Sequence, residues 1–246
     1  YSVPIPNENP DGTRTQKEGV FLPVNITSIA VSPDLKELVR ITPEQTQGML
    51  NTSNSFNKGI KEIFKNPLKE WIVYWPQKNS IYLQTKAAGL FDGFLYKVET
   101  SEKRLRRIVG NVKGLTASVS PGGKYVLYSE SINNGFVAKI LNTKTGSIKN
   151  TNLAILPEKC TWLKNEDLVC AGNSSVENGT YPDVWYAGLV SFSDQLFRIY
   201  TESNTFDVIY KNDEGSFDMT NLRADEERSL LFFTDKKTGI LWQFSF

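Results

Sequence analysis

Short apolar segments of strand length follow one another along the chain, separated by Pro, Gly, Asn and Asp residues that favour turns. Trp71–Trp75, Tyr125–Tyr128 and Leu230–Phe233 are examples, rich in aromatic and β-branched side chains. Where polar residues intervene, they alternate with apolar ones at a period of two. No stretch long enough to form a helix has apolar residues at helical spacing. This pattern is typical of strands in antiparallel sheets. We therefore expect an all-β protein.

The strands recur at a nearly fixed period, in five copies of a strand–turn–strand unit. The equivalent turn positions are Pro33, Pro76, Pro121, Leu163 and Ala224, which lie 43, 45, 42 and 61 residues apart. Each copy continues with further strands, giving a unit of four. Four-stranded antiparallel units about every 43 residues are typical of β-propeller blades, because one such sheet cannot bury both faces alone. A β-sandwich is the competing fold, but its turns would not recur so evenly. We predict a β-propeller of four-stranded blades, about five of them in this chain.

The repeats define the expected domain organisation. Residues 21–246 form the predicted propeller, and residues 1–20 form an N-terminal arm or a closing strand. The last copy ends after a third strand, so Val3–Pro6 or Gly19–Leu22 could supply the fourth, although proline suits only a sheet edge. A larger ring, of which these are five blades, is the alternative. Because the chain starts at Tyr1 rather than Met, we expect a removed signal, a missing upstream segment or a fragment.

The fourth copy is longer than the others by about 18 residues, inserted after its second strand at about Gly172–Leu189. Long loops inside a compact domain are often functional. This one carries aromatic side chains of the kind that anchor protein interfaces or stack on sugars, and the corresponding loop of the second copy would join the same rim. The candidate partner-binding residues are therefore Tyr181, Asp183, Trp185, Tyr186 and Phe91. The alternative is that the insertion's aromatic residues pack beneath the loop as a local core and contact no ligand.

Two cysteines, Cys160 and Cys170, flank the turn of the fourth copy. If the hairpin is centred on Asn165, they lie opposite each other and can form a cross-strand disulfide. The alternative is two free thiols packed as small apolar side chains. A disulfide would indicate a location outside the cytoplasm.

The composition excludes several kinds of catalytic and metal-binding site. The 246 residues carry a formal net charge of +1 and include no histidine, which excludes Ser-His-Asp catalysis and histidine-ligated metals. Two cysteines are too few for a four-thiolate cluster, and no Gly-rich phosphate-binding loop occurs. We expect no catalytic residues, no metal site and no cofactor. The balanced charge argues against a nucleic-acid partner. No run of about 18 apolar residues is present, so we expect no membrane span in this chain.

The turns of the first and third copies, Val31–Lys36 and Val119–Tyr128, read VSPDLK and VSPGGKYVLY. They resemble the SPDGK turn of TolB-type and WD-repeat-like bacterial β-propellers. Leu156–Trp162 and Gly179–Tyr186 also resemble segments of uncharacterised propeller proteins predicted in small-genome bacteria. The resemblance covers about residues 20–246 and speaks to fold rather than function.

The sequence departs from that pattern in places. Leu35 stands where the turn usually has Gly, Gly122 stands where it usually has Asp, and the Trp-Asp dipeptide of WD repeats is missing. We therefore do not expect the buried network that this aspartate forms with a histidine in WD repeats. TolB proteins organise a protein complex of the outer membrane. The resemblance implies only that this chain binds another protein of the cell envelope.

We therefore predict a non-enzymatic scaffold that binds a protein partner in the periplasm, in the cell envelope or at the cell surface. An anchor upstream of Tyr1 is compatible with this location. Three alternatives stay open: a carbohydrate-binding propeller, an accessory propeller region of a larger protein, and an enzyme. An enzyme would show Asp, Glu, Arg and Tyr clustered at the mouth of the central channel, whereas apolar or small residues there would count against it.

Overall fold

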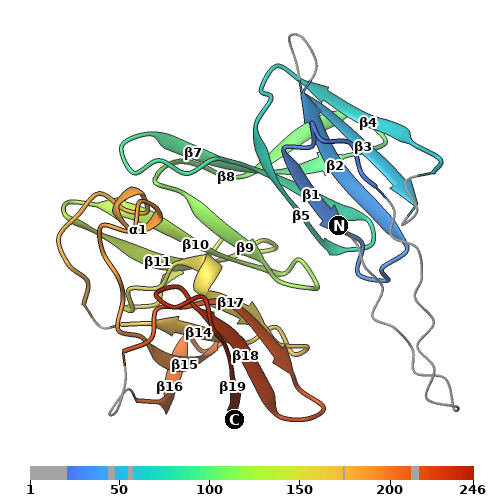
Figure 1. Ribbon diagram of the computed structural model, residues 1–246. Coiled ribbons are helices and arrows are strands. Elements are labelled where there is room, and N and C mark those ends of the chain that lie inside the picture. The colour runs from blue at the N-terminus through green and yellow to red at the C-terminus, as the bar shows by residue number, and fades with distance from the viewer. Residues whose placement is uncertain (1–20, 44–47, 55–57, 174, 212–215) are drawn as a thin grey trace, which may run out of the picture.

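A computed structural model describes residues 21–43, 48–54, 58–173, 175–211 and 216–246 (Figure 1). Within these ranges the chain forms five antiparallel sheets that follow one another in sequence order, which confirms the predicted five-bladed β-propeller. In this described part of the chain, helix is limited to a 3-10 turn, η1 (Pro157–Lys159), and one α-helical turn, α1 (Asp183–Tyr186). In the described part of the chain, no helix is both long and apolar enough to cross a membrane.

Each of the first four sheets contains four strands joined by hairpins. The first sheet consists of β1 (Ser28–Val31), β2 (Glu37–Pro43), β3 (Gly48–Asn54) and β4 (Lys61–Asn66). The second consists of β5 (Trp71–Gln77), β6 (Ser80–Thr85), β7 (Asp92–Glu99) and β8 (Arg104–Lys113). The third consists of β9 (Thr116–Val119), β10 (Tyr125–Ile132), β11 (Gly135–Asn142) and β12 (Ile148–Asn150). The fourth consists of β13 (Cys160–Trp162), β14 (Leu168–Gly172), β15 (Gln195–Tyr200) and β16 (Thr205–Tyr210).

The fifth sheet has three strands among the described residues: β17 (Met219–Asp225), β18 (Leu230–Asp235) and β19 (Leu241–Ser245). The chain therefore ends on a third strand, as the repeat predicted. Of the two segments considered for the fourth strand, Val3–Pro6 lies outside the described residues. Phe21 and Leu22, at the end of the other segment, are not in a strand.

The SPDLK and SPGGK turns join the first two strands of their sheets through the same contacts. The backbone N–H of Glu37 donates to Ser32 Oγ at 2.9 Å, and that of Tyr125 donates to Ser120 Oγ at 3.0 Å. The fourth residue of each turn has a positive φ, 59° at Leu35 and 68° at the corresponding glycine. A leucine at positive φ is uncommon. The serine and backbone contacts thus define this turn even without the usual glycine.

The turn of the second copy lies slightly later than we predicted from Pro76. This proline is part of β5, and the turn falls at residues 78–79. The pairing of β5 with β6 shifts register between Tyr74 and Gln77. Such an irregularity accommodates a residue that lacks an N–H group.

Apolar side chains fill the space between each pair of successive sheets. The four resulting clusters include Val39 with Trp71, Leu95 with Val126, Leu127 with Phe197, and Val169 with Leu231. Among the described residues, no such cluster joins the fifth sheet to the first, and Figure 1 places these two sheets at opposite ends of an arc. Ile29 and Val31 of β1 accordingly stay more than 40% exposed.

The hairpin of β13 and β14 carries the disulfide. Cys160 and Cys170 are directly opposite in the register of the two strands and form a covalent bond. The alternative of two free thiols is therefore wrong. The bond lies in the apolar cluster between the third and fourth sheets.

We predict that protein prepared under oxidising conditions is two hydrogen atoms lighter than its reduced form. The Cys160→Ser, Cys170→Ser variant should lose about 2–3 kcal/mol of unfolding free energy, because the closed loop is short. Intact mass spectrometry and urea unfolding with and without reductant measure both effects. An unreduced mass equal to the reduced mass would contradict the disulfide.

Candidate functional site

A pocket of about 630 Å³ lies where β5, β9 and β17, the first strands of their sheets, face η1 and α1. Its volume is in the range of pockets that bind small molecules. Apolar lining comes from Ile72, Ala117 and Pro157. The polar and aromatic lining residues are Tyr74, Ser118, Glu158, Trp185, Tyr186, Thr220, Asn221, Arg223 and Lys236. We call this the central pocket.

Glu158 is the acidic group of the central pocket. The hydroxyl of Tyr186 donates a hydrogen bond to its Oε1 atom, while Oε2 is buried and has no hydrogen-bond partner among the described residues. Burial raises the pKa of Glu158, and the bond from Tyr186 partly opposes that change. Burial also raises the pKa of Tyr74 and of Tyr186, so both phenols keep their protons. Glu158 thus brings to the pocket lining a carboxylate with one buried oxygen, Oε2, that accepts no hydrogen bond from the described residues.

Two cationic side chains line the same pocket. The Nζ atom of Lys236 donates to the backbone carbonyl of Trp185 and lies 4.7 Å from the centroid of its ring. Arg223 donates from Nη1 to the carbonyl of Leu222 at 3.0 Å and is exposed. A guanidinium group has five N–H donors, so Arg223 retains donors for a ligand acceptor.

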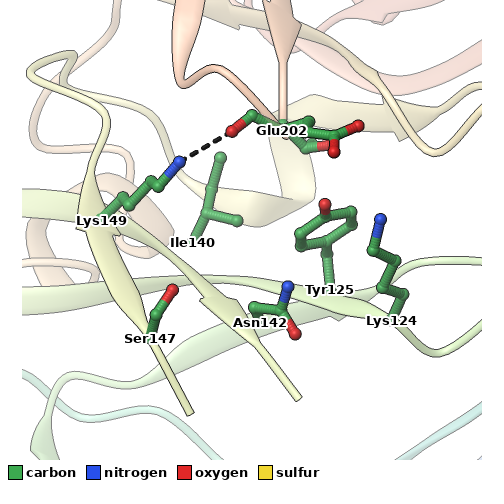
Figure 2. Close-up of a pocket in the computed structure, with 8 residues that line it drawn as sticks. Lys124, Tyr125, Ile140, Asn142, Ser147, Lys149 and Glu202 are labelled. Atoms are coloured by element: carbon green, nitrogen blue, oxygen red, sulfur yellow. Dashed lines mark hydrogen bonds between the residues drawn. The ribbon is translucent and has the colours of Figure 1, made fainter. Parts of the chain in front are cut away.

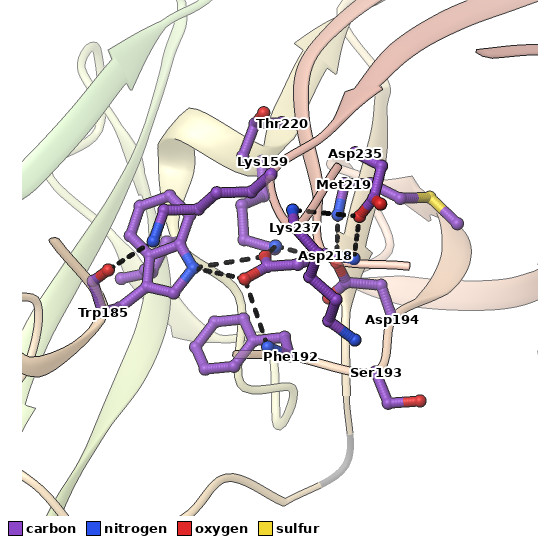
Figure 3. A network of polar contacts seen from close by, with 12 residues as sticks. Lys159, Trp185, Phe192, Ser193, Asp194, Asp218, Met219, Thr220, Asp235 and Lys237 are labelled. Carbon is purple, nitrogen blue, oxygen red and sulfur yellow. Dashed lines mark hydrogen bonds and ion pairs between the residues drawn. The ribbon is translucent and has the colours of Figure 1, made fainter. Parts of the chain in front are cut away.

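Lys159 follows Glu158 but points into the protein, where it is fully buried (Figure 3). Its Nζ atom lies 2.8 Å from Asp194 Oδ2 and also pairs with Asp218 Oδ1. Both aspartates are fully buried as well. Trp185 donates its indole N–H to Asp218 Oδ2 at 2.9 Å, and the backbone N–H of Phe192 donates to the same atom at 3.2 Å. This lysine and two aspartates are called the buried triad below.

The two carboxylates of the buried triad belong to different parts of the chain. Asp194 lies shortly after the insertion, directly before β15, and accepts the backbone N–H of Met219 at 2.6 Å, while Asp218 immediately precedes β17. Burial raises the pKa of Asp194 to about 6, although Lys159 lowers it. A buried ammonium is tolerated only when carboxylates and hydrogen bonds compensate its lost hydration. The triad therefore ties the insertion to the fourth and fifth sheets.

The insertion also contacts the second sheet. The backbone N–H of Gly89 donates to both carboxylate oxygens of Asp183 at 3.1 Å. A Cβ atom at Gly89 would lie 2.5 Å from Thr180 Cγ2 and from the Tyr181 carbonyl oxygen, so only glycine permits this approach. The insertion therefore reaches from the loop after β6 to the start of β17, and α1 forms part of the pocket wall between them.

The structure places the sequence-predicted binding residues in three different settings. Tyr181 and Trp185 are buried in a local apolar core with Phe136 and Phe192. Tyr186 is 46% exposed and lines the central pocket. The carboxylate of Asp183 is occupied by Gly89, as described above. Tyr181 and Trp185 thus pack within the local apolar core, although Trp185 also lines the central pocket, and Tyr186 is partly exposed to solvent.

Phe91 lies in the loop between β6 and β7 and is 73% exposed. The same loop contains Gly89, so the structure brings it beside the insertion. The loop between β10 and β11 is adjacent too, because the N–H of Gly179 donates to the Asn134 carbonyl at 3.3 Å. Phe91 is not among the residues that line the central pocket.

Glu158, Arg223, Lys236 and the buried triad were not among the predicted site residues. One signal was present in the sequence: Glu158 and Lys159 are adjacent charges within the otherwise apolar stretch 153–163. Charged residues inside an apolar stretch are often paired or functional. Their partners could not be identified, because Asp218 lies 59 residues away from Lys159.

A smaller pocket of about 260 Å³ lies between the third and fourth sheets (Figure 2). Lys149 closes one side by donating to the backbone carbonyl of Glu202 at 2.7 Å. Lys124 lies over the ring of Tyr125, 4.8 Å from its centroid. Lys149 thus joins the two sheets across this smaller pocket, so the larger central pocket is the better candidate site.

Three solved structures place this architecture among known folds. TolB from Acinetobacter baumannii is 15% identical with a TM-score of 0.50, over 80% of this chain and 45% of that one. A chain of the nidogen/laminin complex is 9% identical with a TM-score of 0.56, over 89% and 75%. The β-propeller domain of the Trilobed protease from Pyrococcus furiosus is 10% identical with a TM-score of 0.56, over 95% and 71%.

These comparisons define the class of the protein by fold: it is a β-propeller similar to TolB-type propellers and to propeller domains of proteases. The chain spans less than half the length of the TolB structure that it matches. No protein-family model matches the sequence, and no curated protein matches it.

We predict that Lys159→Met lowers the unfolding free energy by about 3–5 kcal/mol, because it leaves two carboxylates buried without their cation. Lys164→Met is the matched control, since its ion pair with Glu227 is exposed on both sides and contributes about 1 kcal/mol or less. Urea unfolding monitored by tryptophan fluorescence measures both. Equal losses in the two variants would contradict the structural role of the buried triad.

Proposed function

We propose that this protein is a non-enzymatic β-propeller scaffold outside the cytoplasm, which binds an extended segment of a protein partner in its central pocket. The observation that carries the proposal is the unpartnered buried oxygen of Glu158 in a pocket that also contains Arg223. A buried acceptor left without a donor costs free energy, which a ligand that supplies the donor recovers.

The chemistry of the pocket favours a peptide as the ligand. A peptide group carries one donor and one acceptor, which match Glu158 Oε2 and the Arg223 guanidinium. Tyr186 and Tyr74 provide amphipathic walls for neighbouring side chains, as tyrosines do in protein interfaces. Because the buried triad holds α1 in place, such a pocket exists before the partner arrives, and preorganisation lowers the cost of binding.

Two observations support the location and the kind of partner. The Cys160–Cys170 disulfide is typical of proteins in oxidising compartments. The fold resembles TolB and a chain of a nidogen/laminin complex, which is itself a protein–protein assembly.

We expect Glu158→Gln combined with Arg223→Ala to weaken binding of the partner at least tenfold while the protein stays folded. The partner is isolated with the wild-type chain from a native envelope extract, and its dissociation constant is then measured with purified proteins. Tyr186→Phe, which removes only the hydroxyl that orients Glu158, should have a smaller effect.

Phe91→Ala is the matched control, because Phe91 is exposed but lies outside the pocket. It should leave the dissociation constant unchanged. If Phe91→Ala weakens binding and the pocket variants do not, the partner binds the outer loops instead and the proposal is wrong.

A second candidate function is acid–base catalysis in the same pocket. It is favoured by the contact between Glu158 and Tyr186 beside Arg223, the residue types that an enzyme in a central channel would need. The isolated partner discriminates the two functions. Chemical change in the partner with the wild-type chain, but not with Glu158→Gln, would establish an enzyme; an unchanged partner agrees with a scaffold.

A further inference from the structure

The buried triad contains one more carboxylate than its lysine needs for charge balance. Lys159, Asp194 and Asp218 are all fully buried, so water hydrates none of the three groups. Aromatic rings enclose the ammonium group, with Nζ 5.2 Å from the ring centroid of Trp185 and 4.8 Å from that of Phe192. Apolar side chains in place of a buried ion pair are often equally stable or more stable. Stability alone therefore does not account for a second aspartate at this position.

The contacts of Asp218 are those of a carboxyl group placed for attack by an amine. Nζ of Lys159 pairs with Oδ1, so the nitrogen lies beside the carboxyl carbon. The other oxygen, Oδ2, accepts the indole N–H of Trp185 at 2.9 Å and the backbone N–H of Phe192 at 3.2 Å. The indole N–H also reaches Oδ1, at the longer distance of 3.2 Å. Two N–H donors on one oxygen stabilise the negative charge of a tetrahedral intermediate.

Asp194 is placed to move protons between the two reacting groups. Its Oδ2 atom lies 2.8 Å from Nζ of Lys159, within hydrogen-bond distance of the ammonium protons. Burial raises the pKa of Asp194 to about 6, closer to neutrality than that of an ordinary aspartate. A carboxyl group of this kind suits a role in which it both accepts and releases a proton.

We propose that Lys159 and Asp218 condense to an intramolecular isopeptide bond, with Asp194 as the proton carrier. Asp194 takes a proton from the ammonium group, and the lone pair of the resulting amine attacks Cγ of Asp218. A C–N bond forms, and negative charge develops on Oδ2. Two protons from the nitrogen, carried in turn by Asp194, pass to Oδ1. The Cγ–Oδ1 bond then breaks and water leaves.

This reaction is balanced without any further reactant. One ammonium and one carboxylate are consumed, one amide and one water are formed, and Asp194 is a carboxylate before and after. No atom changes its oxidation state. The reaction occurs once in each chain, so it goes beyond the proposed binding function and does not depend on it.

Burial distinguishes this pair from another close lysine–carboxylate contact in the protein. Lys139 and Glu130 also form a hydrogen-bonded ion pair, but their side chains are 28% and 31% exposed. Hydration keeps such a pair ionised. In the buried triad, fixed positions replace random encounter, and the exclusion of water strengthens the N–H contacts to Oδ2.

The bond would join the segments that precede the fourth and fifth sheets. Lys159 ends η1 directly before β13, and Asp218, which is 59 residues further along the chain, directly precedes β17. The ion pairs described above are the arrangement before condensation. Trp185 keeps its acceptor afterwards, because Oδ2 becomes the amide oxygen. The covalent bond therefore makes permanent the contact that the ion pair establishes.

Mass spectrometry of the folded full chain, with the disulfide reduced, tests the proposal. The wild type should be one water molecule lighter than its sequence requires. Trypsin does not cleave after an acylated lysine, so the digest should contain a branched peptide that joins residues 150–164 to residues 212–223. Cleavage after Lys139 should be normal, which makes the exposed pair an internal control.

Variants of the triad and of the exposed pair separate the roles of the residues. Asp194→Asn keeps the size of the side chain but cannot carry the proton, and it should have the full sequence mass while circular dichroism shows a folded sheet protein. Lys159→Met lacks the nucleophile and should also have the full mass. Glu130→Gln is the matched control and should still be one water molecule lighter.

Three results would overturn the proposal. The first is a folded wild type with the full sequence mass, which requires no variant to fold. The second is a loss of water located within one linear peptide. The third is a branched peptide that persists in Asp194→Asn, which would contradict the role of that aspartate. None of them would affect the proposed binding in the central pocket, which is tested at Glu158 and Arg223.

Discussion

The ammonium group of Lys159 has no access to water, and the arrangement of the site depends on how that charge is compensated. Its two carboxylate partners come from the segment that joins the insertion to β15 and from the residue before β17 of the fifth sheet. Because a buried charge without partners would cost several kcal/mol, these segments cannot separate without unfolding part of the protein. Asp218 also accepts the indole N–H of Trp185, so the same charge network fixes α1.

The consequence is a defined pocket rather than an open loop. Tyr186 follows Trp185 in α1 and reaches Glu158, which itself precedes Lys159 in η1. The polar group that faces the pocket and the cation that holds the insertion are thus neighbours in sequence with opposite orientations. Because Asp183 accepts the N–H of Gly89, the insertion also contacts the second sheet and thus connects it with the fifth. The proposed binding surface combines the propeller sheets with one long loop.

Much of the fold could be predicted because local chemistry repeats at a fixed period. The turns after Val31 and Val119 marked the blades, and the position of Cys160 opposite Cys170 followed from counting residues along one hairpin. The site was less predictable. An amphipathic aromatic residue such as Trp185 can face a partner or its own loop, and only tertiary contacts decide which.

The buried contacts of the site could not be predicted either, because they too depend on tertiary contacts. Periodicity describes neighbours within a blade, whereas Lys159 and Asp218 are 59 residues apart and lie before the first strands of the fourth and fifth sheets. Glu158 lies in a 3-10 turn that belongs to no repeated strand, so no copy elsewhere in the chain indicated its orientation. In the proposed site, Glu158 and Tyr186 lie where the repeat is interrupted, in η1 and α1, whereas Arg223 lies on the repeated strand β17.

The central claim is that the insertion is fixed to the body of the protein by the buried triad. Exchange of the indole N–H of Trp185, followed by NMR spectroscopy, tests it most directly, with the half-exposed Trp242 as reference. The account predicts that this proton exchanges only through global unfolding, with a protection free energy equal to the unfolding free energy. Fast exchange through local opening, in a protein that otherwise remains folded, would contradict it.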